Sequence, residues 1–224
     1  MQRRPEPELM NDLHQVRAYA AADFSDGDQH TAQLVDQLIA AGPVMPAKPR
    51  VLDLGCGPGN ITLLLARELP QADLIGIDGA EPMLSIARER AAQLKLNIAF
   101  QCRDLRDLPG GVLAGAMDLI VSNSLLHHLH QPSLLWEVTR SLAAPGCRVL
   151  HRDLRRPTSD AELRRLQAVQ LPDAPEVLRQ DFIASLAAAF EPAEVEDQLR
   201  QAGLDGLSVS QEGDRYLVVS GLVG

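Results

Sequence analysis

The sequence predicts an α/β fold: a doubly wound, mostly parallel sheet of seven strands with helices on both faces. Two observations lead to this prediction. Between residues 50 and 151, short apolar runs typical of buried strands alternate with stretches whose apolar residues recur at helical spacing. Three glycines, Gly55, Gly57 and Gly59, directly follow the first of these strands and precede a helix. With 224 residues, of which 46% are hydrophobic, the chain can fill the core of one such domain.

Residues 1–49 are predicted to form a helical cap ahead of the sheet. Apolar residues recur every three or four positions within residues 8–22 and again within residues 31–41, as they do on one face of a helix. Residues 42–49 contain three prolines, which end the second helix and lead the chain to its first strand.

The alternating region, residues 50–151, is predicted to form the core of the sheet. Strands separated by helices are joined by crossover connections, so they run parallel. Pro70 ends the first helix, and Pro82 stands where it suits the first turn of the second. Strands are expected at residues 51–54, 73–77, 97–102, 117–122 and 147–151, and helices at residues 61–69, 82–94 and 134–142.

A helical insertion is predicted at residues 152–190. Its helices, expected at residues 160–169 and 182–190, occupy a connection that is short in most α/β domains. Because the insertion follows the carboxyl end of a strand, we interpret it as a lid over a ligand site; a helical flange that only packs is the alternative. The single domain is expected to close in residues 191–224, with a helix at 192–202 and strands at 208–211 and 216–223.

Charge and composition argue against several classes of function. The chain has 21 Lys and Arg against 30 Asp and Glu, a net charge of −9, whereas proteins that bind phosphate backbones need a basic surface. Aromatic residues, at 3%, are few for stacking bases. No apolar run is long enough to cross a membrane, and no apolar stretch follows the N-terminal arginines, so neither insertion nor secretion is expected. Cys56, Cys102 and Cys147 form no CxxC pair, which favours a reducing, cytoplasmic location.

The segment from Asp53 to Gly59 predicts a ligand site at the end of the first strand. Its alternating glycines allow a tight turn and let a ligand approach the backbone closely. Asp78 ends the second strand, where a carboxylate can accept hydrogen bonds from both hydroxyls of a ribose. Asp53 would repel a pyrophosphate at this turn but attract a ligand with a cationic end. Alternatively, Asp53 only caps the turn through backbone N–H groups.

Together these motifs resemble the class I S-adenosylmethionine-dependent methyltransferases. Asp53-Leu-Gly-Cys-Gly-Pro-Gly59 is similar to the first motif of that family, and Asp78 is similar to its ribose-binding acidic residue. Asp104-Leu105 is similar to the pair that meets the adenine edge. Residues 118–129 resemble the fourth strand with the turn that faces the acceptor, and residues 142–150 resemble the passage into the fifth strand. The resemblance covers the alternating region and the closing helix and strands.

The resemblance implies that S-adenosylmethionine is the cofactor and S-adenosylhomocysteine the product. The glycines would pack against the methionine part, Asp53 would lie near its ammonium group, and Asp78 would hold the ribose. Gly79 and Met83 would lie beside the adenine. The predicted cofactor-binding residues are Asp53, Gly55, Cys56, Gly57, Gly59, Asp78, Gly79, Met83, Asp104, Leu105 and Asn123.

Methyl transfer needs little acid–base help, because the sulfonium is an activated donor and in-line positioning supplies most of the catalysis. For an acceptor that must lose a proton, the candidates follow the fourth strand, and we predict Asn123 and His127 as catalytic residues. The alternative is a structural turn in which one histidine packs against the next helix. A metal ion on His127 and His130 would need a third ligand such as His151 or Asp153, which lack a motif spacing, so no metal is expected.

Three regions are expected to shape the acceptor site. The N-terminal helices, which cover the donor's methyl group in similar proteins, supply two aromatic residues, and the turn after the fourth strand supplies two histidines. Two arginines after the fifth strand could bind a carboxylate or phosphate in a bidentate manner, although a surface salt-bridge cluster with Asp153 is the alternative. The predicted acceptor-binding residues are Tyr19, Phe24, His127, His128, Arg155 and Arg156.

The sequence therefore predicts a cytoplasmic enzyme that methylates a small-molecule acceptor, with no nucleic-acid or membrane partner. One alternative is an RNA or protein methyltransferase, disfavoured by the negative charge and by the lack of an appended binding domain. Another is a catalytically silent protein that only binds the cofactor. After Asn123 the chain lacks the Pro-Pro-Tyr of adenine-N6 and glutamine methyltransferases, and neither tyrosine has a lysine four residues later, as short-chain dehydrogenases require.

Overall fold

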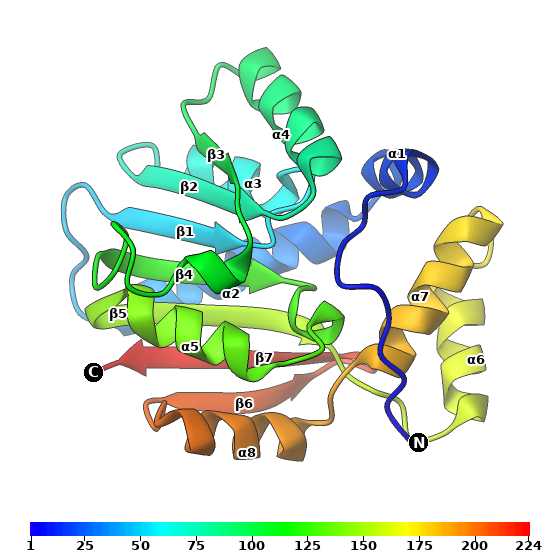
Figure 1. Ribbon diagram of the computed structural model, residues 1–224. Helices are drawn as coiled ribbons and strands as arrows, with labels where there is room; N and C mark the ends of the chain where they lie inside the picture. Colours follow the sequence, from blue (N-terminus) through cyan, green and yellow to red (C-terminus); the bar gives the residue numbers. More distant parts are fainter.

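In the computed structural model, which describes residues 1–224, seven strands form one sheet in the order β3-β2-β1-β4-β5-β7-β6 (Figure 1). Neighbours from β3 to β5 pair in parallel, whereas β7 runs antiparallel to β5 and to β6. This arrangement, with helices on both faces, confirms the predicted fold class. The strands are β1 (Arg50–Leu54), β2 (Asp73–Asp78), β3 (Ala99–Cys102), β4 (Met117–Asn123), β5 (Ala143–Leu154), β6 (Leu207–Glu212) and β7 (Tyr216–Val223).

Eight α-helices and two short 3₁₀ helices precede, connect or follow the strands. The α-helices are α1 (Leu13–Ala21), α2 (Ser25–Ala41), α3 (Asn60–Glu68), α4 (Glu81–Gln93), α5 (Ser133–Leu142), α6 (Asp160–Gln170), α7 (Glu176–Ala188) and α8 (Pro192–Ala202). The 3₁₀ helices are η1 (Leu105–Asp107) and η2 (Leu126–His128).

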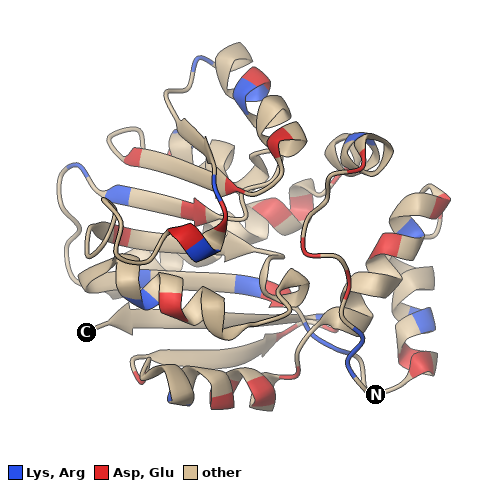
Figure 2. Ribbon diagram, in the orientation of Figure 1, with Lys and Arg blue, Asp and Glu red and all other residues tan.

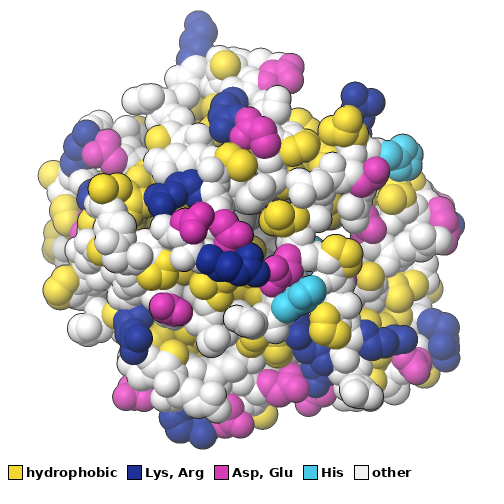
Figure 3. Space-filling model, viewed as in Figure 1, with side chains coloured by type: hydrophobic (Ala, Val, Ile, Leu, Met, Phe, Trp, Pro, Cys, Tyr) yellow, Lys and Arg dark blue, Asp and Glu magenta, His cyan; other side chains and the backbone are white.

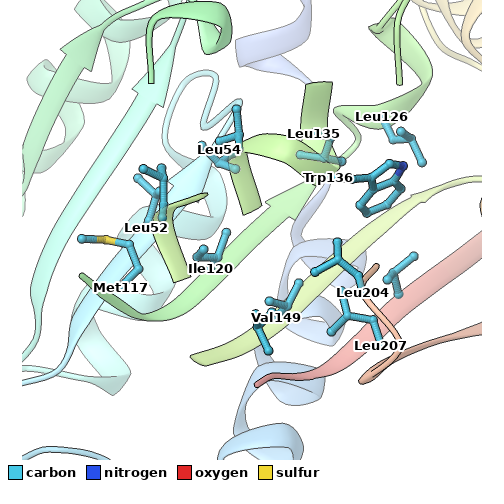
Figure 4. Packing of buried hydrophobic residues seen from close by; sticks show 14 of the residues in the cluster. Leu52, Leu54, Met117, Ile120, Leu126, Leu135, Trp136, Val149, Leu204 and Leu207 are labelled. Atoms are coloured by element: carbon cyan, nitrogen blue, oxygen red, sulfur yellow. The ribbon is translucent and has the colours of Figure 1, made fainter. Parts of the chain in front are cut away.

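Alternating side chains of the strands divide the core between the two faces of the sheet. On one face, Leu52 and Leu54 of β1 join a cluster with Trp136 of α5 (Figure 4). The same cluster includes Val195 and Leu199 of α8. On the other face, Val51 packs with Leu65 of α3 and with α2. Full burial of each such side chain contributes about 1.5–3 kcal/mol. The two layers together hold the carboxyl ends of β1, β2, β4 and β5 side by side.

The N-terminal helices have other limits than the sequence predicts. Helix α1 begins only at Leu13, because the carboxylate of Asp12 accepts a hydrogen bond from the backbone N–H of Gln15 and caps the helix. Helix α2 begins at Ser25 rather than at residue 31, with Asp26 and Asp28 in its first turn, where the helix dipole favours negative charge.

The insertion after β5 also differs from the prediction. Strand β5 continues beyond residue 151 to Leu154, because these additional residues pair with the start of β7. Helix α7 begins after Pro175 rather than at residue 182, and it ends before Phe190, which forms a bridge with Arg155. Helices α6 and α7 lie beyond the carboxyl ends of the parallel strands (Figure 1).

Residues 1–12, here called the N-terminal segment, cross the carboxyl edge of the sheet (Figure 1). The guanidinium of Arg3 donates hydrogen bonds to the carbonyl of Ala188 and to those of His127 and Leu129. The backbone N–H of Arg4 donates to the carbonyl of Ala187 at 2.9 Å. The segment therefore ties α7 to the turn after β4. No helix of the chain combines the length and the apolar character that a membrane crossing requires.

Candidate functional site

A cavity of about 870 Å³ opens at the carboxyl edge of the sheet. Its walls come from the ends of β1, β2, β4 and β5, from the N-terminal segment, and from helices α2 and α7. Ligands of open parallel sheets bind at this edge. In Figure 3, acidic and basic side chains and a histidine gather near the middle of the visible face, beside the N-terminal segment.

The glycine turn after β1 leaves one side of its backbone open to the cavity. Gly55, Gly57 and Gly59 all have positive φ angles, of 65°, 51° and 84°, which residues with a Cβ rarely adopt. A Cβ built at Gly57 would meet no atom within 4 Å, whereas one at Gly55 would lie 2.7 Å from Cδ1 of Leu125. Gly57 therefore offers the space in which a ligand can approach the chain.

Asp78 holds this turn against the end of β2. Its Oδ2 accepts a hydrogen bond from the N–H of Gly57 at 2.8 Å, and its Oδ1 accepts one from the N–H of Ala80 at 2.7 Å. Burial raises the pKa of Asp78, and the backbone N–H groups oppose that shift. Each carboxylate oxygen keeps a further lone pair for a donor on the cavity side, such as a ribose hydroxyl.

Asp53 lies in the floor of the cavity and is only 1% exposed. Its Oδ2 accepts a hydrogen bond from the hydroxyl of Thr62 at 2.6 Å. Burial raises the pKa of Asp53 to about 7, although the Thr62 hydrogen bond acts in the opposite direction. A cationic ligand group at this position would favour the ionised carboxylate.

The other residues predicted from the resemblance to bind the cofactor are brought to the same cavity, with one exception. Its lining includes Cys56, Gly79, Met83, Asp104, Leu105 and Asn123. Gly59 is not part of the lining, because a Cβ there would face Ala87 of α4 at 3.2 Å. Gly59 instead lets α3 and α4 approach each other.

The two aromatic residues predicted to bind the acceptor lie next to each other. The rings of Tyr19 and Phe24 lie 4.9 Å apart between centroids, and both line the cavity. Asn123 also lines the cavity, and its Oδ1 accepts a hydrogen bond from the hydroxyl of Thr31 at 3.0 Å. Asn123 is thereby fixed at the end of β4.

The two arginines predicted to bind the acceptor do not line the cavity. Arg156 is buried elsewhere, where its guanidinium contacts the carboxylates of Glu191 and Glu194 at 3.1 and 2.9 Å. Arg155 donates a hydrogen bond to the carbonyl of Asp214 at 3.0 Å. Both side chains are turned to the C-terminal part of the chain because β5 continues to Leu154 and carries them past the cavity.

Arg152, which no motif in the sequence indicates, lines the cavity instead. Its guanidinium lies 3.6 Å from the ring centroid of Tyr216, its Nε donates to Glu212 at 2.7 Å, and one amino group lies 3.4 Å from the hydroxyl of Thr31. The other amino group has no hydrogen bond within the protein. The alternation of β5 is the signal that could have revealed it, because Arg152 must face opposite to His151 and Asp153.

His127 and His128 both line the cavity, but they have different partners. His127 is 2% exposed; its Nδ1 lies 2.6 Å from Oδ1 of Asp153 and its Nε2 lies 3.5 Å from Oε1 of Glu6. Nδ1 of His128 lies 3.1 Å from the same Glu6 oxygen. Burial would lower the pKa of His127, but the carboxylates of Asp153 and Glu6 raise it. Glu6, which sequence spacing gave no reason to select, therefore closes off the ring nitrogen predicted to act as a base.

The two other histidines near the carboxyl edge of the sheet, His130 and His151, form no hydrogen bond with the side chains of His127 and His128. Nε2 of His130 contacts the backbone carbonyl of Glu6 at 2.7 Å. His151 is buried between the hydroxyls of Ser122 and Thr139, at 2.8 and 3.0 Å. Burial lowers the pKa of His151 to about 3, so this residue is a neutral part of the core.

Residues 51–146, which include the glycine turn and the ends of β1, β2 and β4, are similar to one protein family. Residues 51–146 match the family model described as a methyltransferase domain. The chain is 38% identical over 129 residues to trans-aconitate 2-methyltransferase of Methylobacterium nodulans, a match that covers 57% of this chain and 46% of that protein. A match to the enzyme of that name from Rhizobium meliloti is 31% identical and covers 58% and 47%. The matches thus span about half the length of these curated relatives.

Solved structures match the fold over nearly the whole chain. A S-adenosylmethionine-dependent methyltransferase from Aquifex aeolicus superposes with a TM-score of 0.68 over 96% of this chain and 100% of its own, at 17% identity. The plantazolicin methyltransferase BpumL, in complex with a triazolic desmethylPZN analog and S-adenosylhomocysteine, gives a TM-score of 0.68 over 95% of this chain and 90% of its own, at 14% identity. At such low identity these likenesses concern the fold.

Proposed function

We propose that this chain is a class I S-adenosylmethionine-dependent methyltransferase, which transfers a methyl group from that donor to a small molecule bound in the cavity. One observation carries the proposal: a single cavity is lined both by Asp53, Gly57 and Asp78 and by Tyr19, Phe24 and other predicted acceptor residues. The open side of Gly57 and the free lone pairs of Asp78 fit the donor. The donor supplies an activated methyl group on a sulfonium.

The residues of this chain act mainly by positioning. Asp53 receives the ammonium of the donor, Asp78 receives the ribose hydroxyls, and Asp104 with Leu105 meets the adenine edge. Asn123, at the end of β4 in the same cavity, orients the acceptor for an in-line approach. Holding the reactants in this geometry supplies about 7–11 kcal/mol of the barrier reduction.

His127 remains the proposed base for an acceptor that must lose a proton, on one condition. Its Nε2 faces Glu6, so the ring can reach an acceptor only when that carboxylate moves aside. The insertion of α6 and α7, which contributes Leu178 and Phe182 to the cavity wall, is proposed to cover the acceptor as a lid.

We propose a small carboxylic acid as the acceptor. The named relatives methylate trans-aconitate, as their name states, and a carboxylate oxygen needs no base. Arg152 supports this class, because its guanidinium lines the cavity with one amino group unbonded and can bind a carboxylate. The free thiols Cys56, Cys102 and Cys147 fit a cytoplasmic location. A protein that binds the donor but transfers no methyl is the second candidate, favoured by the closed position of His127.

Two measurements on the purified chain test this function. Calorimetry with S-adenosylmethionine, S-adenosylhomocysteine and NAD is expected to give micromolar binding of the first two and none of NAD. Incubation with the donor and trans-aconitate, or other small di- and tricarboxylic acids, is expected to give a methyl ester in the mass spectrum. If the chain binds the donor but no methylated acid forms, the second candidate, a protein that binds the donor without transferring its methyl group, is favoured. If the chain does not bind the donor, the proposal is contradicted.

A further inference from the structure

We propose that Glu6, His127 and His128 form a binding site for a transition-metal dication of the Zn²⁺ class at the rim of the cavity. The three residues come from two distant parts of the chain, the N-terminal segment and η2. Oε1 of Glu6, Nε2 of His127 and Nδ1 of His128 all lie within 4.8 Å of one another. The site goes beyond the methyl-transfer function and does not require it, but His127 cannot act as a base while its Nε2 binds the metal.

The distances between these atoms suit a shared cation. Bonds of about 2.0–2.1 Å at tetrahedral angles place neighbouring ligand atoms roughly 3.3 Å apart. Oε1 of Glu6 lies 3.5 Å from Nε2 of His127 and 3.1 Å from Nδ1 of His128. Nδ1 of His128 is buried and, although close to Glu6, has no hydrogen bond of acceptable geometry.

Asp153 gives His127 the orientation that a metal ligand needs. Its carboxylate contacts Nδ1 of the ring at 2.6 Å, which holds the proton on that nitrogen and leaves the lone pair on Nε2 toward Glu6. Histidines that bind metals commonly donate their other ring N–H to a carboxylate in this way.

The charge around the cluster also favours a cation. The carboxylates of Glu6 and Asp153 are buried beside two imidazoles, and Asp181 lies near enough to Glu6 for its own pKa to be raised by burial and by that charge. Arg3 is the cation near His127, and its guanidinium is directed to backbone carbonyls. Figure 2 shows acidic positions on the N-terminal segment where it passes the strand ends. A bound dication would compensate this excess of negative charge.

The ligand set selects the kind of metal. Two imidazole nitrogens and one carboxylate suit Zn²⁺, Co²⁺ or Ni²⁺, whereas Mg²⁺ and Ca²⁺ prefer oxygen ligands. Three protein ligands leave a fourth position, and both histidines line the cavity, so that position is available to water or to an oxygen atom of a ligand. The sequence predicts no metal, because the spacing of His127 and His130 offers only two ligands. In the folded chain, Glu6 and His128 lie beside His127 and provide the other two ligands.

Cobalt binding tests the site directly. Co²⁺ is titrated into tag-free, chelator-treated protein, and the visible absorption of four-coordinate Co²⁺ is followed, with Zn²⁺ then added in competition. The same titration is made with Glu6→Gln and His128→Ala, and with Asp153→Asn. Two control variants remove metal-binding groups elsewhere: His14→Ala on the exposed face of α1, and Cys102→Ser, which removes the exposed thiol.

We expect one equivalent of Co²⁺, displaced by Zn²⁺, with both control variants equal to the unchanged protein. Glu6→Gln and His128→Ala should each weaken binding at least tenfold, and Asp153→Asn by about 10–100-fold. Thermal unfolding in the presence of chelator verifies that each variant is folded. The proposal is overturned if no saturable binding occurs, if Glu6→Gln and His128→Ala bind as the unchanged protein does, or if Cys102→Ser abolishes the signal.

Discussion

Nδ1 of His127 lies 2.6 Å from Oδ1 of Asp153, and this contact joins the turn after β4 to the end of β5. Both side chains are 2% exposed. The other oxygen of Asp153 accepts a hydrogen bond from the backbone N–H of Leu126, also at 2.6 Å. One buried carboxylate therefore positions both the backbone of the turn and the imidazole that follows it.

Replacing Asp153 with Asn is expected to lower the free energy of unfolding by about 1.5–3 kcal/mol, because the buried imidazole of His127 loses its hydrogen bond to a charged carboxylate. Urea unfolding in the presence of a chelator measures the change in metal-free protein. Asp197→Asn is the control, because its contact with Arg200 lies on an exposed helix surface and contributes about 0–0.5 kcal/mol. An equal loss of unfolding free energy in the two variants would show that the contact of Asp153 with His127 stabilises the fold no more than an exposed ion pair does.

Replacing Asp78 with Ala is expected to weaken binding of S-adenosylmethionine by about 1–3 kcal/mol, or roughly 5–150-fold, because the ribose hydroxyls lose their acceptor. Calorimetry gives the affinity. Asp73→Ala is the matched control: it removes a carboxylate from the same strand, β2, at the opposite and exposed end. A donor affinity unchanged in Asp78→Ala would remove this residue from the donor site.

Asp53 predicts a pH dependence of donor binding. Burial raises its pKa to about 7, so below pH 7 the free protein holds a proton that an incoming ammonium must displace. Affinity for S-adenosylmethionine should therefore rise between pH 5.5 and 7, by at most roughly tenfold per pH unit, and then level off. Asp53→Asn, which cannot ionise, should bind more weakly and lose this dependence. A steep slope that persists in Asp53→Asn would assign the titration to another group, such as Asp28, whose pKa burial raises to about 6.

Local sequence signals predict the fold well where each element carries its own pattern. The period of the apolar residues and the glycines and prolines at their ends identify all seven strands of the sheet. The first and last residues of a strand or helix are less well predicted where contacts between distant parts of the chain determine them. Strand β5 reaches Leu154 because β7 pairs with it, and α7 ends before Phe190 because that residue bridges to Arg155.

The same distinction applies to the candidate site: residues with a local sequence signal are predicted, and residues placed by distant contacts are not. Asp53, Gly57 and Asp78 were predicted because strand ends in a parallel sheet meet at one edge, and all three line the cavity. Glu6 and Arg152 were missed because their neighbours depend on how the N-terminal segment and β7 pack. No spacing in the sequence relates Glu6 to His127, which only the folded chain brings to 3.5 Å.

Alanine variants of Gly57 and Gly110 distinguish the cost of a strained backbone from the loss of space for a ligand. Both have positive φ, of 51° and 72°, and a Cβ at either would meet no protein atom within 4 Å. Alanine at each should therefore cost a similar free energy of unfolding, about 1–2 kcal/mol, from the left-handed backbone alone. Only Gly57 lines the cavity, so only Gly57→Ala should weaken donor binding, by tenfold or more. Equal donor affinity in the two variants would mean that no ligand approaches this turn.

Arg152→Gln tests the acceptor class. A charge-assisted hydrogen bond to a carboxylate contributes about 1.5–3 kcal/mol, so the KM for a carboxylic acid acceptor should rise roughly 10–150-fold. Donor affinity should stay unchanged, because Arg152 lies on β5 and is not one of the predicted cofactor-binding residues.

Arg155→Gln is the control for this change, because its side chain is three residues further along the chain and outside the cavity. It should leave the KM for the acid unchanged, with any effect confined to stability through the lost bond to the carbonyl of Asp214. If Arg155→Gln raises the KM and Arg152→Gln does not, the acceptor carboxylate binds near the later arginine, as the sequence predicted, and α6 and α7 must move to admit it. If neither variant changes the KM, neither Arg152 nor Arg155 binds a carboxylate of the acceptor.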